Sequence, residues 1–70
     1  MRTYTAIVKK DESGAYLAVV PALPACYAQG DTYEEALANI REVIELVLED
    51  LAETGEAIPQ EVGSERIAVA

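Results

Sequence analysis

The chain has 70 residues, 51% hydrophobic and 6% aromatic, which is enough for one small domain with a core of aliphatic side chains. Its 13 acidic and 5 basic residues give a net charge of −8, which argues against direct binding of DNA or RNA phosphates. One cysteine cannot form an internal disulfide, and the lack of histidine removes the commonest general base and metal ligand near neutral pH.

Two strands joined by a tight turn are predicted at the start of the chain. Residues 2–10 alternate in side-chain character and are rich in β-branched types, and residues 15–20 form a second apolar run. Between them, Gly14 can adopt a positive φ at low cost and Asp11 can bond to nearby backbone. We therefore expect an antiparallel hairpin.

A proline-bounded loop and a short third strand are expected next. Pro21 and Pro24 lack the N–H that a strand ladder needs, so they end the second strand. Residues 26–29 then form a strand that Gly30 closes. Cys26 is interpreted as a small buried hydrophobe, because the chain has no histidine to lower its pKa.

Capping signals predict one long helix. Thr32 is a suitable N-cap, and Glu35 three residues later completes a capping box. Gly55 and Pro59 mark the far end, which gives a helix of roughly 22 residues. Helical periodicity places six aliphatic residues on one stripe facing the core: Leu37, Ile40, Ile44, Val47, Leu48 and Leu51.

The opposite side of this helix is acidic and carries one leucine. At 100° per residue, Glu42, Leu46, Glu49 and Glu53 share that side. Single exposed leucines are common on protein surfaces, so Leu46 is either a solitary surface residue or a contact point. We select these four residues as the candidate partner-binding site.

A last strand is predicted at residues 65–70, which gives the element order β-β-β-α-β. One helix then packs on a mostly antiparallel sheet, in a single α+β domain spanning residues 1–70. The first two strands carry apolar residues on both faces, and one helix cannot cover both. This predicts self-association into a dimer or tetramer.

Signals for catalysis are weak. Ser13 and Ser64 lack the surroundings of a nucleophile elbow, and the glycines form no nucleotide-binding motif. A magnesium-dependent nuclease would need converging carboxylates, and the candidates are Asp11, Glu12, Asp31 and Glu35, whose turn and capping roles already account for them. We predict a protein that is no enzyme, with no catalytic residues, cofactor or metal.

Without a signal-peptide pattern or an apolar run of roughly 18 residues, we expect a cytoplasmic location and no membrane contact.

The chain resembles the HicB-like antitoxin family over nearly its whole length. The shared features, in the order of the family, are residues 16–26 with their two prolines, the entry Gly30-Asp31-Thr32, the helix pieces Glu35-Ala36-Leu37 and Asn39-Ile40, and Ile58-Pro59. One position departs from the family pattern: Ala25 stands where the family usually has glycine before the cysteine.

The resemblance implies a partial ribonuclease-H-like fold without nuclease carboxylates, assembled into dimers or larger forms. It also implies a non-enzymatic antitoxin that binds and blocks HicA, a small basic toxin that cleaves messenger RNA. The family's separate DNA-binding domain has no counterpart in these 70 residues, so repression of an operon is not carried over. The alternatives are an orphan homo-oligomer of unassigned role and a weak metal-dependent nuclease.

Overall fold

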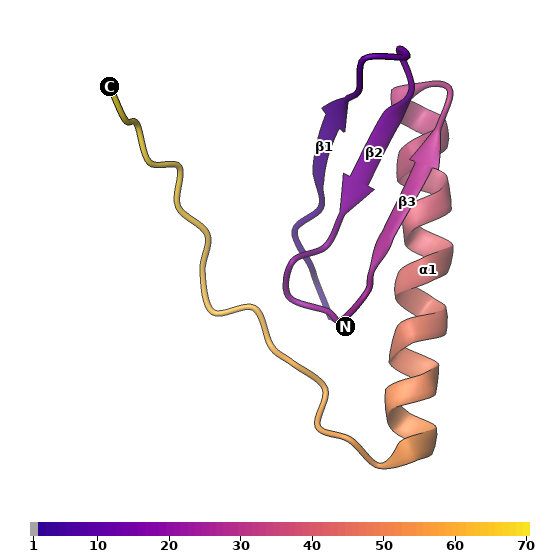
Figure 1. Ribbon diagram of the computed structural model, residues 1–70. Coiled ribbons are helices and arrows are strands. Elements are labelled where there is room, and N and C mark those ends of the chain that lie inside the picture. The colour runs from indigo at the N-terminus through magenta and orange to yellow at the C-terminus, as the bar shows by residue number, and fades with distance from the viewer. Residues whose placement is uncertain (1) are drawn as a thin grey trace.

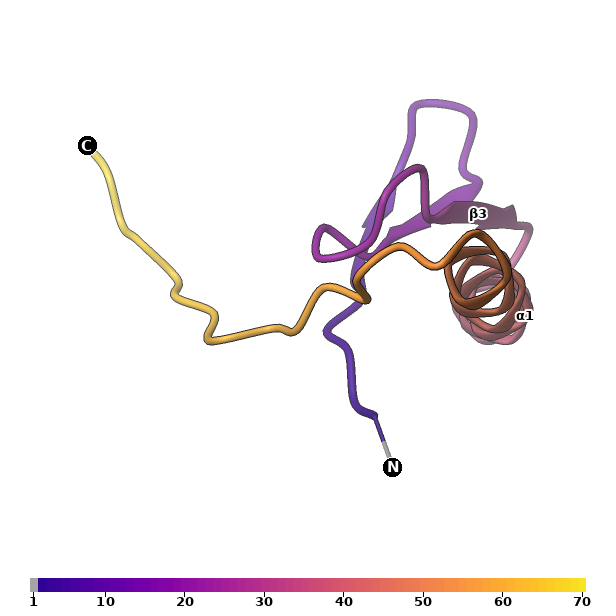
Figure 2. The ribbon, with the colours of Figure 1, turned by 90° about the horizontal axis from the view of Figure 1, so that it is seen from below.

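The computed structural model describes residues 2–70, which form three strands, one helix and an extended C-terminal segment (Figure 1). Strands β1 (Ile7–Lys10), β2 (Tyr16–Val19) and β3 (Tyr27–Gly30) make an antiparallel sheet in the order β1-β2-β3. Helix α1 (Tyr33–Thr54) packs on one face of this sheet, mainly against β3 (Figure 2). The predicted α+β class is confirmed.

The predicted hairpin is confirmed, although its strands are shorter than expected. The carboxylate of Asp11 accepts hydrogen bonds from the backbone N–H groups of Ser13 and Ala15 at 2.8 and 3.1 Å, and Gly14 has a φ of 93°. The first strand begins at Ile7 and not at residue 2. Continued backwards, the register would place Thr5 opposite Pro21, which has no N–H to donate to the ladder.

The helix begins and ends where its capping residues predict. Thr32 Oγ1 accepts the backbone N–H of Glu35 at 3.1 Å, and the Glu35 carboxylate accepts the N–H of Asp31 at 3.0 Å. The return bond of this capping box therefore goes to the residue before the N-cap. At the other end, Gly55 adopts a left-handed φ of 74° and closes the helix.

One predicted core position is wrong. The buried residues are Ala18, Val20, Leu23, Cys26, Ala36, Ile40 and Leu51. Leu37, expected on the core stripe, is 36% exposed, whereas Ala36 is fully buried and Val43 packs against the core. The close approach of Ala36 to Gly30 turns this side of the helix toward the sheet, which leaves Leu37 at the boundary of the core.

The predicted last strand is also wrong. Residues 56–70 contain no strand or helix, and the chain runs away from the body of the protein (Figures 1 and 2). The Glu61 carboxylate accepts the backbone N–H of Thr5, which by the alternation of the ladder lies on the side of β2, and the chain diverges from β1 beyond that point. The observed order is β-β-β-α, and the ribonuclease-H-like likeness stays a prediction.

Candidate protein-binding surfaces

Four residues form an exposed stripe along α1, which we call the acidic ridge: Glu42, Leu46, Glu49 and Glu53. All four are exposed, and Leu46 leaves 64% of its surface accessible. They follow one another at spacings of three and four, so they adjoin on the helix surface. The structure thus brings the predicted residues together, and their role in binding stays a prediction.

The charges of the acidic ridge repel one another. Glu49 and Glu53 are four residues apart, as are Glu45 and Glu49 at its border. Like charges at this spacing destabilise a helix by roughly 0.2–0.5 kcal/mol per pair. A cationic partner would remove this repulsion, so the ridge is suited to bind basic groups.

The outer face of the sheet, opposite α1, is a second candidate surface. The strand register aligns Ile7 with Val19 and Val19 with Tyr27, so the three side chains form a row across the strands. Ile7 is 54% exposed and Tyr27 is 61% exposed, and Leu17 lines an open pocket beside Val19 and Tyr27. The prediction that apolar residues occupy both faces of the sheet is confirmed.

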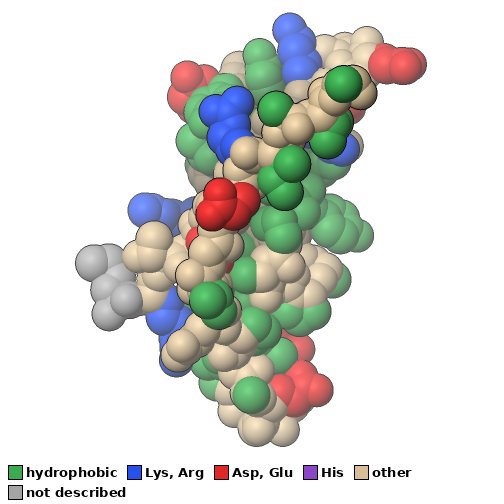
Figure 3. All heavy atoms as spheres, turned by 90° about the vertical axis from the view of Figure 1, so that its left-hand side faces the viewer, with side chains coloured by type: hydrophobic (Ala, Val, Ile, Leu, Met, Phe, Trp, Pro, Cys, Tyr) green, Lys and Arg blue, Asp and Glu red, His purple; other side chains and the backbone are tan. Residues whose placement is uncertain are grey.

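Figure 3 views the molecule from the side on which the C-terminal segment projects. Hydrophobic side chains emerge there between charged ones. The C-terminal segment carries three exposed aliphatic residues, Val62, Ile67 and Val69, which are 99%, 81% and 87% exposed.

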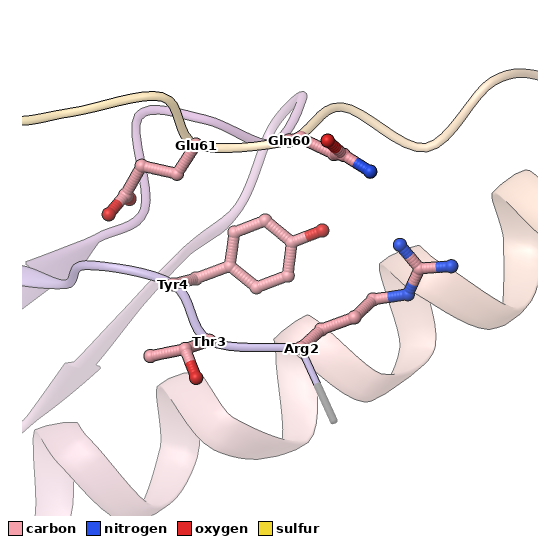
Figure 4. A pocket seen from close by; sticks show the side chains of 5 residues that line it. All are labelled: Arg2, Thr3, Tyr4, Gln60 and Glu61. Carbon is pink, nitrogen blue, oxygen red and sulfur yellow. The ribbon is translucent and has the colours of Figure 1, made fainter.

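A polar pocket lies where the N-terminal residues meet the start of the C-terminal segment (Figure 4). Arg2, Thr3, Tyr4, Gln60 and Glu61 line it. The Tyr4 hydroxyl donates to the Pro59 carbonyl at 2.9 Å, and the Thr5 N–H donates to Glu61 Oε1 at 2.8 Å. The Thr5 hydroxyl and N–H together lower the pKa of Glu61. These bonds hold residues 59–61 beside the stretch that leads into β1.

Two of the four carboxylates considered for a metal site, Asp11 and Glu35, hold local structure. Asp11 closes the hairpin turn, and the hydrogen bond from the Ser13 hydroxyl lowers the pKa of its carboxyl group. Glu35 caps the N-terminus of α1 by accepting the Asp31 N–H. Within residues 2–70, no three histidine, cysteine, aspartate or glutamate side chains are arranged to hold a metal ion.

Cys26 is 2% exposed, and burial raises the pKa of its thiol, in keeping with a packing role.

None of the helical structure described for residues 2–70 is both long and apolar enough to cross a membrane.

Comparison with known proteins identifies the family. Residues 4–68 match a family described as HicB-like antitoxin of bacterial toxin-antitoxin systems, which suggests a non-enzymatic module with a toxin partner. A UPF0150 protein of Thermoplasma acidophilum is 48% identical over 62 residues, covering 89% of this chain and 90% of that protein. A UPF0150 protein of Synechocystis is 45% identical over 58 residues, covering 83% and 73%. An uncharacterised protein of Haemophilus phage HP1 is 35% identical over 57 residues, covering 81% of this chain and 42% of the phage protein. The chain therefore belongs to the HicB-like antitoxin family.

Proposed function

We propose that this protein neutralises a small basic toxin of the HicA kind, which cleaves messenger RNA, by binding directly to it in the cytoplasm. The observation that carries the proposal is the acidic ridge on a member of an antitoxin family. A protein that grips RNA must present cations to the phosphates. A surface of carboxylates can occupy the same cations and so compete with RNA for them.

Within the acidic ridge, the leucine and the glutamates have different roles. Leu46, which is 64% exposed, supplies an apolar anchor that a partner can bury. Glu42, Glu49 and Glu53 surround it as a polar rim that orients the partner and accelerates association. No group on the protein needs to react, because occupying the toxin's RNA-binding surface is sufficient.

Self-association is a second part of the proposal. A chain of this length buries only about 60% of its unfolded surface when it folds alone. The outer face of the sheet leaves Ile7 and Tyr27 more than half exposed, and a second copy could cover them. A homo-oligomer without a toxin is the alternative function that this observation favours.

A growth assay tests the neutralisation. A small basic toxin of the HicA kind is induced in bacterial cells, with and without this protein. We expect the wild type to restore growth, Leu46→Asp to fail, and Val62→Asp to succeed. Val62→Asp is the matched control because Val62 is 99% exposed and lies outside the acidic ridge.

Failure of the wild-type protein to restore growth would contradict toxin neutralisation. Restoration by Leu46→Asp as complete as that by Val62→Asp would instead reject the acidic ridge as the binding site. Circular dichroism of both variants shows whether they are folded.

A further inference from the structure

The two edges of the sheet differ in how they are covered. At the β3 edge, the side-chain amide of Asn39 donates to the Gln29 carbonyl at 2.8 Å, and the first turns of α1 pack against Gly30. At the other edge, no strand within residues 2–70 lies beyond β1. Open edges of this kind are templates for pairing with another chain.

The backbone groups that β1 leaves open follow from its pairing with β2. The Asp11 N–H donates to the Ala15 carbonyl at 2.8 Å, and the register pairs Lys9 with Leu17. Residues of an antiparallel pair alternate between bonding to the partner strand and pointing away from it. The N–H and C=O groups of Val8 and Lys10 therefore face the open edge.

Residues 65–70 have the pattern of a strand that has not formed. Ile67 and Val69 would point to one face of an extended chain, with Arg66 and Ala68 on the other. Both apolar side chains are more than 80% exposed. The segment projects from the body of the protein, so it is accessible to a second molecule (Figures 1 and 2).

The early part of the same segment is held beside the chain that enters β1. Pro59 and Glu61 are bonded to Tyr4 and Thr5, and from there the chain leaves its own sheet. These bonds occupy only the stretch before β1. They leave the open groups of Val8 and Lys10 available to another copy.

We infer that residues 65–70 of a second copy add to the open edge of β1, and that two copies exchange these segments reciprocally. The inference rests on the self-association proposed above and does not involve the acidic ridge. When Ile67 and Val69 lie on the face that carries Ile7, they extend the row formed by Ile7, Val19 and Tyr27. The exchange then covers apolar surface on both partners.

Charge and size are compatible with the same arrangement. β1 carries Lys9 and Lys10 and no acidic residue, and the side chains of the incoming segment, with Glu65 and Arg66, bring no net positive charge to it. This edge is thus one of the few basic places on a chain of net charge −8. One short strand is a small contact, but a reciprocal exchange doubles it and brings it closer to the roughly 1,200–2,000 Å² of a stable interface.

Sedimentation equilibrium of the full chain at about 1–100 μM, in the absence of toxin, tests the association. We expect a dimer whose dissociation constant rises at least about tenfold on Ile67→Asp. Leu46→Asp, which also replaces an exposed aliphatic residue by aspartate but lies on the acidic ridge, should change it by less than about twofold. A protein that stays monomeric throughout, or a dimer that Ile67→Asp leaves unchanged, would overturn the exchange.

An isotope-filtered nuclear Overhauser experiment on mixed labelled and unlabelled wild-type protein tests the contact itself. We expect intermolecular signals from the Ile67 methyl groups of one copy to Ile7 and Val8 of the other. A dimer whose intermolecular signals come from other residues would overturn the inference. A protein that is monomeric yet restores growth in the toxin assay would also overturn the exchange, but it would still support toxin neutralisation.

Discussion

Gly30 of β3 lies so close to Ala36 of α1 that a Cβ atom on Gly30 would clash with the Ala36 backbone nitrogen. The next nearest atoms, the Glu35 carbonyl carbon and the Ala36 Cα at 2.8 and 2.9 Å, are also backbone, so no side chain can move aside. This contact brings the start of α1 down onto the sheet. It thereby places Ala36 and Ile40 in the core.

Replacing this glycine should therefore destabilise the fold. We expect Gly30→Ala to lower the free energy of unfolding by about 2–3 kcal/mol, because the helix must shift away from the sheet. Gly63→Ala is the matched control, since a Cβ there would meet nothing within 4 Å, and it should change stability by less than about 0.5 kcal/mol. Urea denaturation of the three proteins measures both, and equal stability of Gly30→Ala and wild type would contradict the contact.

Ala25 is the only non-glycine residue among residues 2–70 with a positive φ, of 48°. The left-handed conformation costs a residue with a Cβ roughly 1–2 kcal/mol. Glycine loses more entropy on folding, which offsets part of the gain. We expect Ala25→Gly to stabilise the protein by about 0.5–1 kcal/mol. In thermal denaturation, a loss of stability at this position would show that the strain is absent.

Replacing alanine by glycine within a helix should instead destabilise the protein. Ala38 lies exposed within α1, where glycine is about 1 kcal/mol less favourable than alanine. Ala38→Gly is therefore the control for Ala25→Gly.

The N-cap of α1 should contribute measurably to stability. Thr32→Ala removes the oxygen that accepts the Glu35 N–H at 3.1 Å, and we expect a loss of about 1 kcal/mol. Thr32→Ser keeps that oxygen and should retain most of the stability. If Thr32→Ala melted like the wild type but lost toxin binding, the residue would belong to the interface and not to the cap.

Glu61 should make stability depend on pH in the acid range. Hydrogen bonds from the Thr5 hydroxyl and N–H hold the pKa of Glu61 below its ordinary value of 4.5. A lowered pKa in the folded state means that the unfolded chain binds the proton more readily. The stabilisation is therefore complete above the ordinary pKa and is lost as the pH falls through the lowered value.

The expected result is a shallower decline of the melting temperature below pH 4.5 for Glu61→Gln than for the wild type. Asp11, whose pKa is also lowered, titrates in both proteins and so cancels in the comparison. Thr5→Val keeps the carboxylate but removes the hydroxyl donor, so it should act in the same direction as Glu61→Gln. Parallel pH profiles for all three proteins would show that the bond contributes nothing.

The sequence predicts those parts of the fold that are specified locally. Thr32, Gly55 and the hairpin turn each act within a few residues, and all three appear where predicted. The strand predicted at residues 65–70 does not form, because a strand also needs an edge to pair with. In this chain Glu61 bonds to Thr5, 56 residues away, and the segment beyond it leaves the sheet; a contact between residues so far apart in the sequence cannot be predicted from a local pattern.

In the candidate site too, the features fixed by local spacing are predictable and those that depend on distant contacts are not. Helical spacing was enough to place Leu46 and the glutamates on one exposed stripe, because periodicity fixes direction around a helix. It could not show that Leu37 would lie at the edge of the core, since that depends on the approach of Ala36 to Gly30.

Binding kinetics of the toxin to immobilised protein test the central claim most directly, that a basic partner is neutralised through the acidic ridge. We expect Glu49→Lys to slow association several-fold at low salt, whereas Glu12→Lys, the same change in charge placed in the hairpin turn, should have a smaller effect. Leu46→Ala should speed dissociation by an amount equivalent to about 1–2 kcal/mol, and Leu37→Ala, on the other side of the helix, should not. Association that is equally fast at all salt concentrations, together with dissociation unchanged by Leu46→Ala, would contradict the account.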